Sequence, residues 1–375
     1  MDIIEINPGS RQDQKRFLQL PFRIYQGIPQ WVPPLASEAS RIFDQKKHPF
    51  YQNGEAAFFL ALDQQGMPCG RVAALNHHKY NEYNHDNAAF FYLFECINDR
   101  NISQALFDRV IDWAKSHGLT KIIGPKGFTA LDGLGLLIKG FEHRPAFGLP
   151  YNPPYYPELI EAAGFKSSGE IVSGYLDPKR MVLPEKIEKV AELVQKRRGM
   201  QVVHFNNRRE LLKIIPELQK LYNNSLEGTT GNIPLTETDL RTMANQLLWF
   251  ANPRLIKIIR KDGALVGFLL AYPDISAAVQ RCRGRLFPIG WLDLLLEIQR
   301  TRWVNINGAA IVEKYRGMGG TALLFKAMYD SIREGGFNHV DLVQIGADNA
   351  KMQLELRSLG IDFYKCHRLY QKMIG

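Results

Sequence analysis

The chain has 375 residues, which favours two domains over one, and its 45% hydrophobic and 23% charged content is ordinary for a globular protein in water. No apolar run is long enough to span a membrane, and the N-terminal MDIIEINPGS does not resemble a signal peptide, so a cytoplasmic protein is expected. The four cysteines form no C-x-x-C pair, which argues against a zinc or disulfide framework, and the net charge of +9 favours an anionic partner or simply a basic surface.

The sequence of the first half predicts alternating strands and helices. After an early helix, Trp31–Pro34 is expected to be extended, because a residue before proline is kept out of the helical region. An amphipathic helix begins near Ile102 and ends at Gly118. Strands are expected at 56–62, 71–75, 88–97, 121–124 and 170–176, with a short helix over 157–165 before the last of them.

The second half follows the same order after a linker and a charged helix over 185–197. Pro216 is expected to kink a helix over 208–226, and Thr236 or Thr238 to cap the next helix. Further strands are expected at 201–205, 255–259, 265–272, 304–312, 339–345 and 362–373, and further helices near 292–300, 321–333 and 350–359. The repetition predicts an α/β fold with a mixed sheet, built from two related domains over residues 1–178 and 179–375.

Two insertions interrupt the repeat. Residues 125–156 are rich in Gly, Pro and aromatic residues, and they could line a pocket or cover hydrophobic surface through Tyr151, Asn152, Tyr155 and Tyr156. In residues 275–302, the apolar run LFPIGWLDLLL is flanked by Arg281, Arg283, Arg285, Arg300 and Arg302. This segment could form a lid, contact a membrane, or dock its apolar face on the fold while its arginines stay solvated, and the sequence favours docking.

A glycine-rich bend, RGMGGT at residues 316–321, joins the strand over 304–312 to the next helix. The first amides of a helix lack internal partners and carry partial positive charge, and glycines let a ligand approach them closely. Such a bend can bind a phosphate or pyrophosphate, although glycines there can also serve close packing alone. The sequence lacks the G-K-S/T of nucleotide triphosphate loops and the spacing G-x-G-x-x-G.

The bend resembles the acyl-CoA pyrophosphate loop of the GCN5-related N-acetyltransferase (GNAT) family, whose pattern is Arg/Gln-x-x-Gly-x-Gly/Ala. Arg316 and Gly319 match it, Thr321 replaces the last small residue, and Glu313 stands where a proline is usual. The resemblance implies that acyl-CoA binds at Ile311, Val312, Arg316, Gly317, Met318, Gly319, Gly320, Thr321 and Asn349. A Gly319→Glu change is expected to abolish CoA binding and leave the fold intact. The matching loop of the first half, residues 98–101, has no glycine and carries Asp99, so no CoA is expected there.

The resemblance implies acyl transfer from a thioester to an amine, which needs a base and an acid. The family's acid is a tyrosine, but its position holds Leu356, so Tyr364, Tyr370 or solvent would have to protonate the thiolate. Asp274 and Glu227 are candidate bases, although either could be a surface or capping acid, and Asn305 and Asn307 could hold a water. The predicted catalytic set is Asp274, Asn307 and Tyr364.

The leading hypothesis is therefore an N-acyltransferase that uses acetyl-CoA or another acyl-CoA, needs no metal, and acts on a small-molecule or peptide amine. One alternative is a transferase of similar fold that uses aminoacyl-tRNA. The charge permits it, but basic and aromatic residues do not alternate along any one element, so a nucleic acid is not favoured. The other alternative is a non-catalytic acyl-CoA-binding module, and an oligomer is left open.

Overall fold

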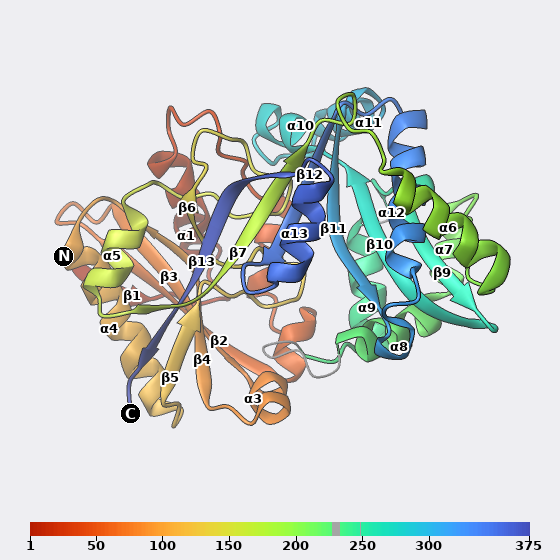
Figure 1. The fold of residues 1–375 in the computed structure, drawn as a ribbon. Coiled ribbons are helices and arrows are strands. Elements are labelled where there is room, and N and C mark those ends of the chain that lie inside the picture. The colour runs from red at the N-terminus through yellow and green to blue at the C-terminus, as the bar shows by residue number, and fades with distance from the viewer. Residues whose placement is uncertain (227–232, 248) are drawn as a thin grey trace.

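One mixed sheet runs through the whole molecule, with helices on both of its faces (Figure 1). The computed structural model describes residues 1–226, 233–247 and 249–375, and within them the sheet has thirteen strands. The predicted α/β class with a mixed sheet is confirmed.

The first half supplies β1 (Asp2–Glu5), β2 (Gly54–Leu62), β3 (Pro68–His77), β4 (Ala88–Cys96), β5 (Lys121–Gly124), β6 (Leu136–Lys139) and β7 (Lys166–Leu176). Its helices are α1 (Arg11–Ile24), α2 (Ala36–Ala39), α3 (His78–Asn84), α4 (Arg100–Ser116) and α5 (Tyr156–Ala162). The short β6 lies in the first insertion and pairs with β13. It was not predicted from the sequence.

The second half supplies β8 (Gln201–Val203), β9 (Ile256–Lys261), β10 (Ala264–Pro273), β11 (Trp303–Ile311), β12 (His339–Gly346) and β13 (Asp362–Met373). Its helices are α6 (Glu185–Arg197), α7 (Arg208–Lys213), α8 (Ile215–Leu226), α9 (Glu237–Leu247), α10 (Ser276–Arg281), α11 (Gly290–Arg300), α12 (Gly320–Glu334) and α13 (Ala350–Ser358). The helix expected over 208–226 is divided into α7 and α8 just before Pro216, and Thr236 caps α9 by accepting from the amide of Asp239.

The last strand of each half pairs with the other half. The strand order is β1-β2-β3-β4-β5-β13-β7-β12-β11-β10-β9-β8, so β13 lies between β5 and β7, and β7 lies between β13 and β12. The antiparallel β13–β7 pair runs from Asp362 opposite Tyr175 to Gln371 opposite Lys166. The two halves therefore complete each other, which two self-contained copies would not do. The predicted boundary at residues 178 and 179 stays a prediction.

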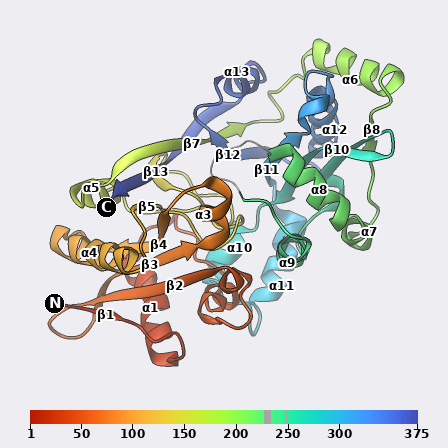
Figure 2. The ribbon, with the colours of Figure 1, turned by 90° about the horizontal axis from the view of Figure 1, so that it is seen from below.

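Separate hydrophobic cores lie on the two faces of the sheet in each half (Figure 2). In the second half, α6, α12 and α13 bury Val194, Leu324 and Leu356 on one face, against Val304 of β11. The opposite face is covered by α7 and α8 through Leu211 and Leu221. Because side chains alternate along a strand, Asn305, the neighbour of Val304 on β11, faces the second side of the sheet.

All four cysteines are free. Among the described residues, no helix has the length and apolarity needed to cross a membrane.

A buried histidine on β13 makes the junction between the halves sensitive to acid. His367 is 2% exposed and its Nε2 donates to the carbonyl of Pro150 at 3.1 Å, while burial lowers its pKa to about 4. Because the unfolded chain takes up this proton near pH 6.5, the histidine contributes full stability above that pH and loses it as the pH falls towards 4.

We expect His367→Gln to reduce the loss of unfolding free energy between pH 7 and pH 5 by up to about 2 kcal/mol. Urea unfolding at several pH values measures this change. The exposed His204, changed to Gln, is the matched control and should leave the pH dependence unaltered. Equal slopes for the two variants would contradict the role given to His367.

Candidate functional site

The strands β11 and β12 separate halfway along their length. Their parallel pairing runs from Trp303 opposite His339 to Ile306 opposite Leu342 and ends there. Beyond this point Gly308 has a φ of +92°, and β10 slips its register against β11 between Leu269 and Ala271. Gly308 and the next residue, Ala309, are exposed, so the open edge of β11 is accessible from solvent.

The glycine-rich bend lies at the end of this open edge. Gly317 and Gly319 have φ values of +75° and +84°, which glycine adopts at little cost. Gly319 is the N-cap of α12 and no side chain caps the helix. In the described part of the chain, the amides of Gly320, Thr321 and Ala322 have no hydrogen-bond partner. The start of α12 therefore offers uncommitted donors and the positive end of the helix dipole to an anion.

Two amides of the predicted binding set already have partners within the chain, and the set itself stays a prediction. The amide of Val312 donates to the carbonyl of Val266 in β10 at 3.0 Å, and that of Met318 donates to Tyr315 at 3.4 Å. The Arg316 side chain turns back, donating to the carbonyls of Ile311 at 3.2 Å and Ser225 at 3.1 Å. The backbone amides that remain free are therefore fewer than expected, and the first of them is that of Gly317.

Gly319 is also unsuited to the test that the sequence suggested. A Cβ on this residue would lie 2.6 Å from Val194 Cγ2 and 2.8 Å from Val190 Cγ1, both on α6. Gly319→Glu would therefore push against α6, and an intact fold is no longer expected for this variant. Around Gly317 no heavy atom lies within 4 Å of an added Cβ, so this position can carry a side chain into open space.

Asn349 and Leu356 lie on or beside α13. The Asn349 side chain is exposed and caps α13 by accepting from the amide of Met352 at 3.1 Å, so its predicted contact with the cosubstrate stays a prediction. Leu356 is buried in the core shared with α6 and α12. Its position therefore serves packing in this chain.

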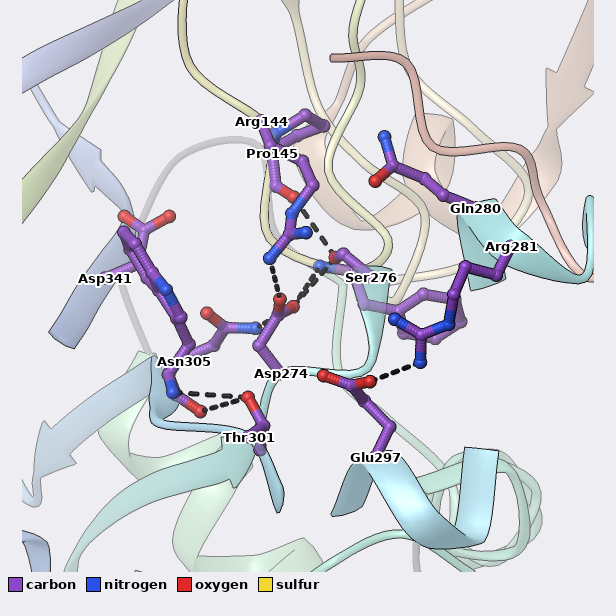
Figure 3. Close-up of polar contacts among 12 residues, drawn as sticks. Arg144, Pro145, Asp274, Ser276, Gln280, Arg281, Glu297, Thr301, Asn305 and Asp341 are labelled. Atoms are coloured by element: carbon purple, nitrogen blue, oxygen red, sulfur yellow. Dashed lines mark hydrogen bonds and ion pairs between the residues drawn. The ribbon is translucent and has the colours of Figure 1, made fainter. Parts of the chain in front are cut away.

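The buried carboxylate of Asp274 links the second half of the chain to the first insertion (Figure 3). Asp274, which follows β10, is 4% exposed. Its Oδ1 accepts from Ser276 Oγ at 2.7 Å, from Asn305 Nδ2 at 2.9 Å and from the Phe147 amide at 3.2 Å, while its Oδ2 pairs with Arg144 at 3.3 Å. With both oxygens occupied, Asp274 is better placed to orient Asn305 than to accept a proton.

Beside this carboxylate is a cavity of about 190 Å³, which reaches from the first insertion to β11, β12 and β13. Among its lining residues are His143, Asp274, Trp303, Asn305, Asp341 and Tyr364. Asn305 and Asp341 stand opposite each other in the strand register and are 1% and 2% exposed. Within the described residues, Asn305 Oδ1 and Asp341 Oδ1 have no hydrogen-bond partner. Because an unpaired buried acceptor is costly, this pair is suited to a water or a ligand that carries N–H or O–H donors.

Asp341 is the strongest candidate for a base in this cavity. Its Oδ2 pairs with Lys365 Nζ at 2.7 Å, and the Tyr364 hydroxyl also interacts with the carboxylate, while Oδ1 makes no hydrogen bond of good geometry among the described residues. Burial raises the pKa of Asp341, and the charge of Lys365 opposes that shift. A carboxylate with a raised pKa holds a proton more readily near neutral pH, as a general base must.

The predicted catalytic residues come together only in part. Tyr364 lines the cavity, where burial and then the charge of Asp341 raise its pKa, so its hydroxyl stays protonated. Asn307 follows Asn305 on β11 and donates to the Tyr272 hydroxyl at 3.4 Å. Tyr370 is buried in the core of the first half and donates to Glu161, away from the cavity. Glu227 lies outside the described residues.

The equivalent loop of the first half is closed by its own side chain. Asp99 caps α4 by accepting from the amides of Asn101 at 2.8 Å and Ile102 at 3.2 Å, so the donors an anion would use are taken. Residues 142–146 of the first insertion line the cavity, but Asn152 and Tyr156 pack elsewhere. Asn152 bonds the backbone of Leu137, and Tyr156 is fully buried, with its hydroxyl on Glu95. That the first-half loop at residues 98–101 binds no CoA stays a prediction.

Among the described residues, no group of three or more His, Cys, Asp and Glu side chains is arranged to hold a metal ion. That metal plays no part stays a prediction.

The order of strands and helices, the splayed pair and the uncapped glycine bend define a protein with the tandem GNAT fold. A tandem GNAT protein from the clavulanic acid biosynthesis pathway superimposes with a TM-score of 0.56 at 12% identity, over 100% of this chain and 98% of that one. A GCN5-related N-acetyltransferase from Sphaerobacter thermophilus gives a TM-score of 0.53 at 13% identity, over 99% and 96% of the two chains. The predicted tandem fold is confirmed.

Two curated proteins are similar along nearly their whole length. Protein YghO of Escherichia coli (strain K12) is 26% identical over 375 residues, covering 97% of this chain and 94% of that protein. The bacterial ceramide synthase of Caulobacter vibrioides (strain NA1000 / CB15N) is 24% identical over 385 residues, covering 100% of this chain and 98% of that protein. No protein-family model matches the chain.

Proposed function

We propose that the protein is an N-acyltransferase that moves an acyl group from acyl-CoA, acetyl-CoA or another, to the amino group of an acceptor. The observation that carries this proposal is the pair of buried acceptors, Asn305 Oδ1 and Asp341 Oδ1, in a cavity beside the splayed strands. An amine supplies the N–H donors that these atoms lack. The free amides at the start of α12 are suited to the pyrophosphate of the thioester cosubstrate.

In this mechanism each group has one task. The amine nitrogen attacks the thioester carbonyl, an N–C bond forms and the C–S bond breaks. Asp341 Oδ1 accepts the proton that the amine loses, and Tyr364 is the proposed donor of the proton that the thiolate gains. Asn307, next to the splay, is proposed to orient the amine or a water, and Asp274 to position Asn305. An amide near Ile311 is the proposed donor to the oxyanion.

The acceptor that we propose is an amine with a long alkyl chain. Ceramide is an N-acyl derivative of a long-chain amino alcohol, and the full-length similarity to a protein named bacterial ceramide synthase supports an acceptor of that chemistry. The cavity is large enough for an amino head group, while a chain would extend outside it. A small-molecule or peptide amine without such a chain is the competing case within the same mechanism.

Release of free thiol from a set of acyl-CoA esters tests this function. We expect release that requires an amine and is fastest with long-chain amino alcohols. Retention of CoA without turnover on any amine would favour the binding module instead. Turnover only with aminoacyl-tRNA, lost at high salt, would favour the tRNA-dependent alternative.

A further inference from the structure

The second insertion exposes an apolar surface that packing does not explain. Five large side chains within nine residues are open to solvent, with exposed fractions of 87% for Phe287, 75% for Ile289, 52% for Trp291, 47% for Leu292 and 45% for Leu295. We call this set the α11 surface. Single exposed apolar residues are normal, but a contiguous group indicates an interaction site.

The helix α11 is apolar on two sides. Leu294 and Ile298 pack on a core formed with Val32, Leu35 and Phe250, as the docking interpretation predicted. Trp291, Leu292 and Leu295 lie on the other side and remain exposed. The docking prediction is therefore only half right, because a helix that merely docks needs one apolar stripe.

The charges around the α11 surface are basic and available. Arg281 is held by Asp293 and Glu297, which uses both acids of the helix. Arg283, Arg285 and Arg300 are exposed, and no carboxylate among the described residues lies within 4.0 Å of them. Arg283 also lies over the Phe22 ring, 5.9 Å from its centroid. Exposed aromatic and leucine side chains beside exposed arginines match the interface of a membrane with anionic lipids.

The α11 surface is also tied to the cavity. The insertion begins after Asp274 and ends before Trp303, and both residues line the cavity. The Asp274 amide donates to the Trp303 carbonyl at 3.0 Å, so the two ends of the insertion are held together. The indole of Trp291 donates to the Pro288 carbonyl at 2.9 Å, which leaves its polar N–H satisfied if the ring enters lipid.

We infer that the α11 surface docks the protein on an anionic bilayer, so that the cavity opens close to the lipid head groups. The inference does not depend on the identity of the acceptor amine. It adds a location at which an amphiphilic amine reaches the site.

Co-sedimentation with phosphatidylcholine vesicles, with and without phosphatidylglycerol, tests the inference on the full chain. We expect binding to the anionic vesicles, weakened at least tenfold in the triple variant Phe287→Gln, Ile289→Gln, Trp291→Gln. Arg283→Glu with Arg285→Glu should weaken it about fivefold per arginine and reduce its salt dependence. The control pair Val182→Gln and Leu354→Gln removes two exposed apolar residues elsewhere and should bind as the unaltered chain does.

Three results would overturn the inference: equal binding to vesicles without phosphatidylglycerol, no binding to either kind, or loss of a dimer in solution when the triple variant is made. The last result would assign the surface to a second copy of the chain. Acylation of a short, water-soluble amine without vesicles separates this inference from the proposed function. The triple variant should keep that activity, whereas a chain inactive on every amine would fail the function and still allow membrane docking.

Discussion

Changing Asp341 to Asn is expected to lower the rate of acyl transfer by about 100-fold or more, the usual effect of losing a general base. The asparagine keeps the size of the side chain and an oxygen at the cavity, but its amide cannot take the proton from the amine. In the unaltered chain kcat/KM should rise with pH through the raised pKa of Asp341. That acidic limb should disappear in the variant, which a pH–rate profile measures.

Removing the Asp341 charge leaves Lys365 buried without its partner, which can destabilise the fold by about 3–5 kcal/mol. The double variant Asp341→Asn, Lys365→Met removes that unpaired charge and should recover stability without recovering the rate. A control on the half-buried pair at the surface of α12, Asp330→Asn beside Lys326, should change neither the stability nor the rate appreciably. Full activity in the folded double variant would exclude Asp341 as the base.

A negative charge at the bend is expected to weaken binding of acyl-CoA by about tenfold or more, because like charges a few ångströms apart near a surface cost about 1–3 kcal/mol. Gly317→Asp places this charge where no atom blocks a side chain. Gly317→Asn is the matched control, since Asn and Asp both tolerate the φ of +75° and differ mainly in charge.

Isothermal titration with CoA at low and at high salt measures both Gly317 variants. The difference in CoA affinity between the Asp and Asn variants should decrease at high salt, because salt screens the charge. Equal affinities for the two at low salt would mean that the pyrophosphate is bound elsewhere.

The bend could be predicted from the sequence because its signal is local. Glycines at 317, 319 and 320 between a strand and an amphipathic helix leave few other conformations, and the structure has the helix start there with free amides. The sequence did not reveal, however, that Gly319 is a poor position for a substitution that tests CoA binding. The packing of Val190 and Val194 of α6 against Gly319 joins distant parts of the chain, and no local pattern encodes it.

The strand exchange could not be predicted, because alternation of apolar residues sets which face of a strand is buried and not which strand lies beside it. β7 and β13 were each found at their place in the chain, yet their partners were not. The same limit hid the link from Arg144 in the first insertion to Asp274.

The positions of Asp341 and Lys365 in the sequence could have indicated a buried charged pair. A single acid in the apolar strand HVDLVQIG, and a lysine among the buried residues of β13, are rare unless they pair or act chemically. The docking prediction for α11 was incomplete because the sequence pattern fits two interpretations. The leucines of α11 lie on both a buried and an exposed side of the helix. The sequence pattern alone does not show which of these sides packs against the rest of the protein.

Amide hydrogen exchange with and without CoA tests the central claim most directly. Binding should slow exchange at residues 317 and 319–322, whose amides at the bend and the start of α12 lack partners, and leave residues 99–102 at the closed first-half loop unchanged. Protection at residues 99–102, or no protection at the bend at CoA concentrations that saturate the protein, would contradict the account.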